Sequence, residues 1–123
     1  MKLEIENKNL VRVINFLDGL SLKGMKSIHR TNLSKQLTEK VKAVGENEKQ
    51  LRDELKGEEL RNELESLMEE KTVIDGGDSQ TTLRSVKSVI KELTSEDSDH
   101  EFKNDDAYAV ACLFDAFNLG GDK

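Results

Sequence analysis

The sequence predicts a mainly α-helical protein with a small β-ribbon, arranged as a single domain over residues 1–123. Charged residues make up 36% of the chain and proline is absent, a composition that suits helices. Apolar residues recur at spacings of three and four along most of the chain, which is the period of an amphipathic helix. We therefore expect a helical bundle with one long helix or a helical hairpin, and a ribbon of residues 2–6 with 71–75.

The two ribbon segments differ from the rest of the chain in pattern. Residues 2–6 alternate apolar and charged side chains, which places Leu3 and Ile5 on one face. Residues 71–75 contain the run Thr-Val-Ile just before a pair of glycines. Two strands alone are unstable, so we expect the ribbon to pack on helices.

The first helix is expected between Leu10 and Leu17, where apolar residues follow a helical period. Asn7 or Asn9 is placed to cap its beginning, and Gly19 is placed to end it.

A longer helical segment follows, in which six side chains are spaced 4, 3, 4, 3 and 4, as in a coiled-coil seam. These six are Leu37, Val41, Val44, Glu48, Leu51 and Leu55. The stripe stays in phase across Gly45, which favours one continuous helix over residues 25–56, although a break at Gly45 remains open. The phase is lost near Lys56-Gly57, which predicts a kink or a tight reversal before the stripe resumes at Leu60.

Two further helices are expected in the last third of the chain. Asp78 or Ser79 would cap a helix with a clean apolar stripe. The stripe consists of Leu83, Val86, Ile90 and Leu93. After an acidic loop at 94–106, residues 105–118 are apolar nearly all round, so we expect this last helix to be the most buried element. Gly120-Gly121 would end it.

Charge is distributed unevenly, with a net +4 in residues 1–50 and −10 in residues 51–123. The basic excess lies within residues 21–45 and predicts a partner-binding surface for phosphates or an acidic protein. Its candidate residues are Lys23, Lys26, Ser27, His29 and Arg30. Lys23, Lys26 and Arg30 are spaced 3 and 4, so on a helix they would share one face. For a chain of net charge −6, the favoured interpretation is still a solvated face, or one neutralised by the chain's own acidic segment at 53–70.

The acidic segment predicts a second candidate surface. Its candidate residues are Glu54, Glu58, Glu59 and Glu63. Closely spaced carboxylates can imitate a phosphate backbone and occupy the basic groove of a nucleic-acid enzyme. Direct binding of nucleic acid is disfavoured, because the chain is acidic overall and lacks interleaved aromatic residues.

The residues give little support for chemistry, and we expect no catalytic, cofactor or metal site. Asp97, Asp99, His100 and Glu101 offer oxygen and imidazole ligands, but their spacing does not make a calcium loop. The run Asp75-Gly76-Gly77-Asp78 is explained by a strand exit followed by a helix cap. Cys112 lies in the most apolar segment, where a thiol is usually an inert core filler.

Several stretches resemble a family of small uncharacterised proteins encoded by bacteriophages and prophages of Gram-positive bacteria. The strongest portion is Phe16-Leu17-Asp18-Gly19-Leu20-Ser21-Leu22-Lys23-Gly24, and Val73-Ile74-Asp75-Gly76-Gly77-Asp78 adds to it. None of these motifs is catalytic. The resemblance implies a phage origin, and with it a role in virion assembly or in handling the host machinery.

We therefore expect a non-enzymatic interaction protein, an assembly or accessory factor that works through helix-mediated contacts with a phage or host protein. The alternative is an acidic inhibitor of a host nucleic-acid enzyme or defence protein, and the long helix leaves a homo-oligomer open. The N-terminal residues lack the apolar run of a secretory signal, and the longest apolar stretch has eight residues. We expect a protein of the host cytoplasm, with virion association open.

Overall fold

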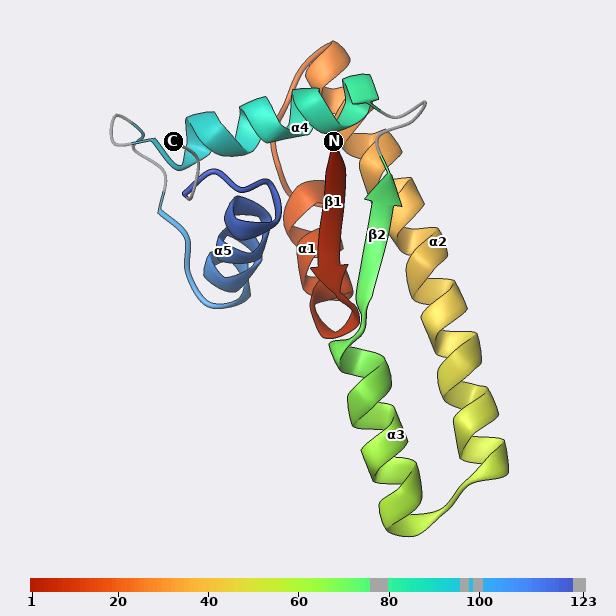
Figure 1. Ribbon diagram of the computed structural model, residues 1–123. Helices are drawn as coiled ribbons and strands as arrows, with labels where there is room; N and C mark the ends of the chain where they lie inside the picture. The colour runs from red at the N-terminus through yellow and green to blue at the C-terminus, as the bar shows by residue number, and fades with distance from the viewer. Residues whose placement is uncertain (76–79, 96–97, 99–100, 121–123) are drawn as a thin grey trace.

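The computed structural model describes residues 1–75, 80–95, 98 and 101–120, and it confirms a mainly α-helical fold with a two-stranded ribbon (Figure 1). The elements in chain order are strand β1 (Lys2–Glu6), the 3-10 turn η1 (Asn7–Asn9), and helices α1 (Leu10–Asp18), α2 (Met25–Glu54) and α3 (Gly57–Glu69), then strand β2 (Lys71–Asp75) and helices α4 (Gln80–Leu93) and α5 (Asp105–Ala116).

The two predicted strands pair with each other in the structure. β1 and β2 run antiparallel, with Lys2 opposite Asp75 and Glu6 opposite Lys71. The alternation of β1 turns Leu3 and Ile5 into the core, where both are almost completely buried. The ribbon is stable because this apolar face packs on helices.

Asn7 connects the end of β1 to α3 instead of capping α1. Its amide nitrogen donates to the Leu67 carbonyl oxygen at 2.8 Å, and its amide oxygen accepts from the Thr72 hydroxyl at 2.6 Å. Asn9 occupies the N-cap position of α1, but its backbone is already helical and its side chain makes no capping bond. The prediction of a side-chain cap was therefore wrong, because the 3-10 turn leads directly into the helix. Gly19 follows the last residue of α1, as predicted.

The core lies among α1, the first part of α2, α4, α5 and the inner face of the ribbon. Sixteen buried side chains form one apolar cluster there, and none of them comes from residues 45–66. Leu33 and Leu37 bring α2 into this cluster, while Leu83 and Ile90 bring in α4. Asp78 and Ser79, the predicted caps of α4, lie outside the described residues.

α2 continues through Gly45 to Glu54, so the interpretation of one helix is confirmed and a break at that glycine is excluded. The chain then reverses, and α3 returns beside α2 (Figure 1). Gly57 has a φ of 65°, a left-handed conformation that favours glycine, which explains why the reversal falls there.

α5 differs from its prediction in two ways. It has three buried residues in 12, whereas α1 has four in nine, so the expectation of the most buried element was wrong. Apolar composition does not show which face of a helix packs against the core. α5 packs through one side, and Tyr108 on another side is 65% exposed. The helix also ends before the glycines. Asn118 adopts φ 58°, and the Leu119 amide donates to the Phe114 carbonyl oxygen, which makes a Schellman-type ending.

Candidate functional site

The C-terminal third of α2 and the whole of α3 project away from the core as a two-helix extension (Figure 1). We call residues 46–70 the arm; the structure describes all of them. Each arm helix can cover only one side of the other, so the apolar seam between them is incompletely shielded. Leu67 is the one arm side chain that is buried. The other large apolar side chains of the arm are only partly buried, namely Leu51, Leu55, Leu60, Leu64 and Met68.

An apolar groove runs along one side of the arm where the arm meets α1. A cavity of about 230 Å³ is lined by Val11, Val41, Val44 and Met68, among others. A second hollow of about 320 Å³ adjoins it, because Met68 and Lys8 line both, and it continues to Leu64. We call the surface formed by Val11, Val41, Val44, Leu64 and Met68 the arm groove. Val11 is 54% exposed within it.

The arm also carries the net charge of the chain. Ten acidic and four basic residues lie between 46 and 70, so the arm has a formal charge of −6, which equals that of the whole chain. The remaining residues are formally neutral, with 15 charges of each sign. The asymmetry between the two halves of the sequence is therefore an asymmetry between the arm and the rest of the molecule.

The predicted acidic residues lie around the tip of the arm, and all four are exposed. Glu58 and Glu59 lie in the first turn of α3, where carboxylates interact favourably with the helix dipole. Glu54 accepts a hydrogen bond from Gln50 at 3.0 Å. Glu58, Glu59 and Glu63 form no ion pair with any residue that the structure describes. Their charges therefore face solvent.

The predicted basic residues lie elsewhere, around the beginning of α2, and several have partners within the chain. The Arg30 guanidinium donates to the Leu17 and Leu20 carbonyl oxygens at 2.8 and 2.7 Å, and contacts Ser27 Oγ at 3.3 Å. Arg30 therefore fastens the end of α1 and the following loop to α2, a structural role that its spacing in the sequence did not reveal.

The other basic candidates do not form one helical face. Lys23 precedes the first residue of α2 and is exposed. Lys26 pairs with Glu92 of α4 at 3.2 Å, so its charge is balanced by α4 and not by the segment 53–70. His29 is half-buried, and its Nδ1 atom has no hydrogen-bond partner in the described structure.

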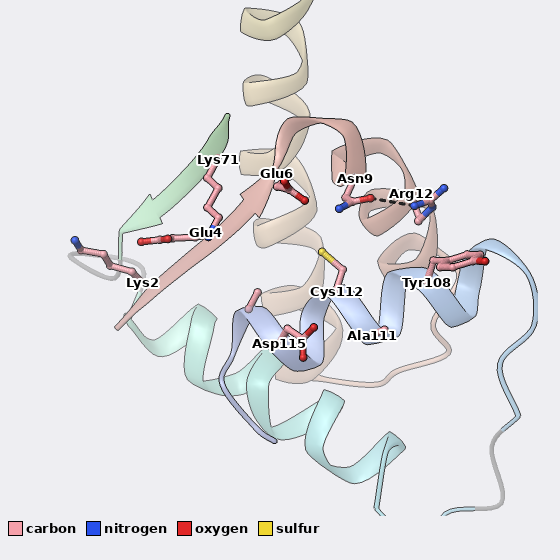
Figure 2. A pocket seen from close by; sticks show the side chains of 11 residues that line it. Lys2, Glu4, Glu6, Asn9, Arg12, Lys71, Tyr108, Ala111, Cys112 and Asp115 are labelled. Carbon is pink, nitrogen blue, oxygen red and sulfur yellow. Dashed lines mark hydrogen bonds between the residues drawn. The ribbon is translucent and has the colours of Figure 1, made fainter. Parts of the chain in front are cut away.

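A separate cavity of about 610 Å³ lies between β1, α1 and α5 (Figure 2). At one end of it, Arg12 donates to Asn9 at 3.0 Å, lies 3.5 Å from an Asp105 carboxylate oxygen and stacks over the Tyr108 ring. Sequence reasoning missed this cavity, because its residues come from three segments far apart in the chain.

Cys112 lies in the wall of this cavity and is half-buried. Burial raises the pKa of its thiol, and the nearby carboxylates of Asp115 and Glu6 raise it further. The thiol therefore stays protonated near neutral pH and is a weak nucleophile.

Among the described residues, no three His, Cys, Asp or Glu side chains are grouped so that they could hold a metal ion. Of the acidic loop candidates, Asp97, Asp99 and His100 lie outside the described residues, and Glu101 is exposed. The glycines of the Asp75–Asp78 run also lie outside them. No described helix is both long and apolar enough to cross a membrane.

Comparison with protein-family models, with curated proteins and with solved structures found no match to this chain.

Proposed function

We propose that this chain is a non-enzymatic interaction protein that binds a partner protein through the arm. The observation that carries the proposal is the arm itself, a projecting pair of helices with an open apolar groove and the entire net charge of the molecule. The sixteen-residue core does not include its outer part, so the arm is not needed to build that core.

The charge of the arm indicates the chemistry of the partner. Two arms packed together would bring −6 against −6, which opposes a dimer formed through this surface. A basic amphipathic helix matches the surface better, because its apolar face fits the arm groove and its Lys and Arg side chains meet the acidic residues. A second copy of the chain would be identified as the partner if the captured protein were this chain itself.

The biological setting follows from the resemblance to phage and prophage proteins. In that setting the chain acts in the cytoplasm of the bacterial host as an assembly or accessory factor, and its partner is a phage or host protein. Association with the virion is a further part of this proposal.

Affinity capture of the tagged full chain from infected and uninfected host cells tests the proposal, with matched variants. Val11→Glu places a charge in the arm groove. Ile28→Glu is the control, because Ile28 is 50% exposed, against 54% for Val11, and lies outside the arm groove. We expect Val11→Glu to lose the captured protein and Ile28→Glu to keep it. Equal recovery with both variants would contradict the proposal.

The second candidate function is an acidic inhibitor of a host nucleic-acid enzyme or defence protein. Glu58, Glu59 and Glu63 support it, because these exposed carboxylates lack ion-pair partners among the described residues. This function predicts that reversing all three to Lys abolishes capture, that Val11→Glu leaves it unchanged, and that DNA competes with the chain for its target. If DNA has no effect on the captured complex, the inhibitor function is excluded.

A further inference from the structure

Gly45 lies inside α2, where the fold of the described chain does not require a glycine. α2 runs from Met25 to Glu54 without a break at this position. Among the described glycines, Gly24 and Gly57 have positive φ values, so the backbone of Gly45 is one that other residues adopt freely. A Cβ atom at Gly45 would meet no described atom within 4 Å. Glycine weakens a helix relative to alanine, and no close packing within the described chain explains it here.

Gly45 does lie on the wall of the arm groove. It is exposed, and it lines the hollow of about 230 Å³ together with Val11, Val44 and Met68. The open space around its Cβ position is therefore part of the arm groove, and a side chain there would narrow the hollow. Glycine is common where another molecule must approach a backbone closely.

The lining of this hollow suits one large aromatic side chain. Its walls include aliphatic side chains from α1 and α2, which cover a ring well. Met68 adds a thioether sulfur, which makes favourable contacts with aromatic rings. Lys8 also lines the hollow, and an ammonium group is attracted to the face of a ring but repels a Lys or Arg of a partner.

Charge does not select the occupant of the hollow. The charged side chains that line it and the adjoining hollow of about 320 Å³ are two cations and three carboxylates, namely Lys8, Arg61, Glu48, Glu65 and Glu69. The size and aromatic character of the occupant therefore determine the fit. The Lys and Arg side chains of a partner helix would meet acidic residues elsewhere on the arm.

We propose that Gly45 makes room in the arm groove for one aromatic side chain, Phe or Trp, on the apolar face of the partner helix, and so determines which helices the arm accepts. The inference rests on the proposed function, because it takes the arm groove as the binding surface. Residues three or four positions from this anchor share its face of the helix, so they would occupy the adjoining hollow beside Leu64 and Met68.

The test selects peptides from a displayed library of amphipathic helices, using the full chain and four variants. Every peptide has Lys and Arg on its polar face, and Ala, Leu, Phe or Trp at random on its apolar face. Gly45→Leu fills the hollow, and Gly45→Ala narrows it while improving the helix. Ala43→Leu is the matched control, because Ala43 is exposed on the same helix, about 200° around it from Gly45, and lines neither hollow. Val11→Glu tests the groove itself, and circular dichroism establishes that each variant is folded.

We expect the peptides enriched on the unmodified chain to carry Phe or Trp at one position of the apolar face. Gly45→Leu should bind these peptides at least about tenfold more weakly, and should select peptides with Ala at that position instead. Gly45→Ala should weaken binding about threefold although it raises the thermal stability of the chain, and Ala43→Leu should change binding less than about twofold.

The outcomes separate this inference from the proposed function. If Val11→Glu abolishes binding, but the unmodified chain and Gly45→Leu select the same residue at the anchor position, the role of Gly45 is overturned and the arm groove remains the binding surface. Enrichment that survives Val11→Glu, or no enrichment on the unmodified chain, would overturn the proposed function and this inference together.

Discussion

Arg30 shows how a charged side chain in a basic segment can serve the fold. Its guanidinium donates to two carbonyl oxygens at the end of α1 and in the loop that follows. The spacing of Lys23, Lys26 and Arg30 predicted a shared helical face, but spacing within one segment does not show which carbonyl groups another segment brings near. The structural role of Arg30 was therefore beyond the reach of the sequence pattern.

Replacing Arg30 with Ala should lower the free energy of unfolding by about 2 kcal/mol, because two charge-assisted hydrogen bonds are lost. Arg30→Lys should recover only part of this loss, since both carbonyl bonds come from Nη1 while Nη2 contacts Ser27 Oγ, and a single ammonium group cannot reproduce both positions. Urea denaturation followed by circular dichroism measures both changes. Lys23→Ala serves as the control at an exposed position, and a loss as large as that of Arg30→Ala would refute the structural role.

Cys112 should react slowly with iodoacetamide at neutral pH, and the rate should rise as the pH increases, because burial, Asp115 and Glu6 raise the pKa of its thiol. Asp115→Asn removes one of the two nearby carboxylates and should speed alkylation at a given pH. Asp106→Asn is the control on the same helix. A similar acceleration by both variants would indicate a change in exposure and not in electrostatics.

The raised pKa of Cys112 also has a consequence for stability. The folded chain binds the thiol proton more tightly than the unfolded chain does. The resulting stabilisation is present at neutral pH and is lost as the pH rises through the folded-state pKa. This pH dependence of stability is opposite in sign to that of a carboxylate whose pKa is lowered by folding, because such a carboxylate stabilises the folded chain at high pH and not at low pH.

Two glycines of the α2–α3 hairpin differ only in backbone conformation. A Cβ atom would meet nothing within 4 Å at either Gly45 or Gly57, but Gly57 alone has a positive φ. Gly45→Ala should therefore raise the free energy of unfolding by about 1 kcal/mol, since Ala is the better helix former. Gly57→Ala should lower it by about 1 kcal/mol, because a side chain there is strained.

Thermal and urea unfolding of the two variants measure these opposite effects. Stabilisation by both would show that the reversal does not require a left-handed residue at 57. Destabilisation by both would show that an alanine side chain at position 45 clashes with neighbouring atoms.

At the scale of elements, the two strands, the continuity of α2 and the reversal at Gly57 could be predicted, because each is visible in the local pattern of the sequence. The pairing of the strands could be predicted because the sequence offered only two of them. α5 was predicted less well. Its composition is apolar nearly all round, yet Tyr108 and Ala111 face outward, since only one side meets α1 and β1. Which face of an apolar helix is covered depends on elements distant in sequence, so composition alone could not decide it.

The periodicity of apolar residues along the sequence could not predict the arm groove either. Val11 follows the buried Leu10 and lies off the inward stripe of α1, which was the only local sign of an apolar surface there. Its neighbours Val44 and Met68 come from other helices. Only the reversal of the chain brings these side chains together.

For the whole molecule, the separation of core and arm predicts that the arm can be shortened without unfolding the core. Removing residues 48–54 and 59–65 takes about two turns from each helix and keeps Gly57 and Leu67. We expect a cooperative thermal transition within about 5 °C of the full chain, measured by circular dichroism. A gradual transition would show that the arm is required for the fold.

The proposed function requires that the arm, and not another face of the molecule, contacts the partner. A photo-crosslinking residue placed at Leu64 in the arm groove, or at the exposed Ser88 of α4, tests it most directly in host cells. We expect an adduct from Leu64 and none from Ser88, with the crosslink on a Lys- and Arg-rich helical segment of another protein. Equal adducts from both positions, or an adduct of two copies of this chain alone, would contradict it.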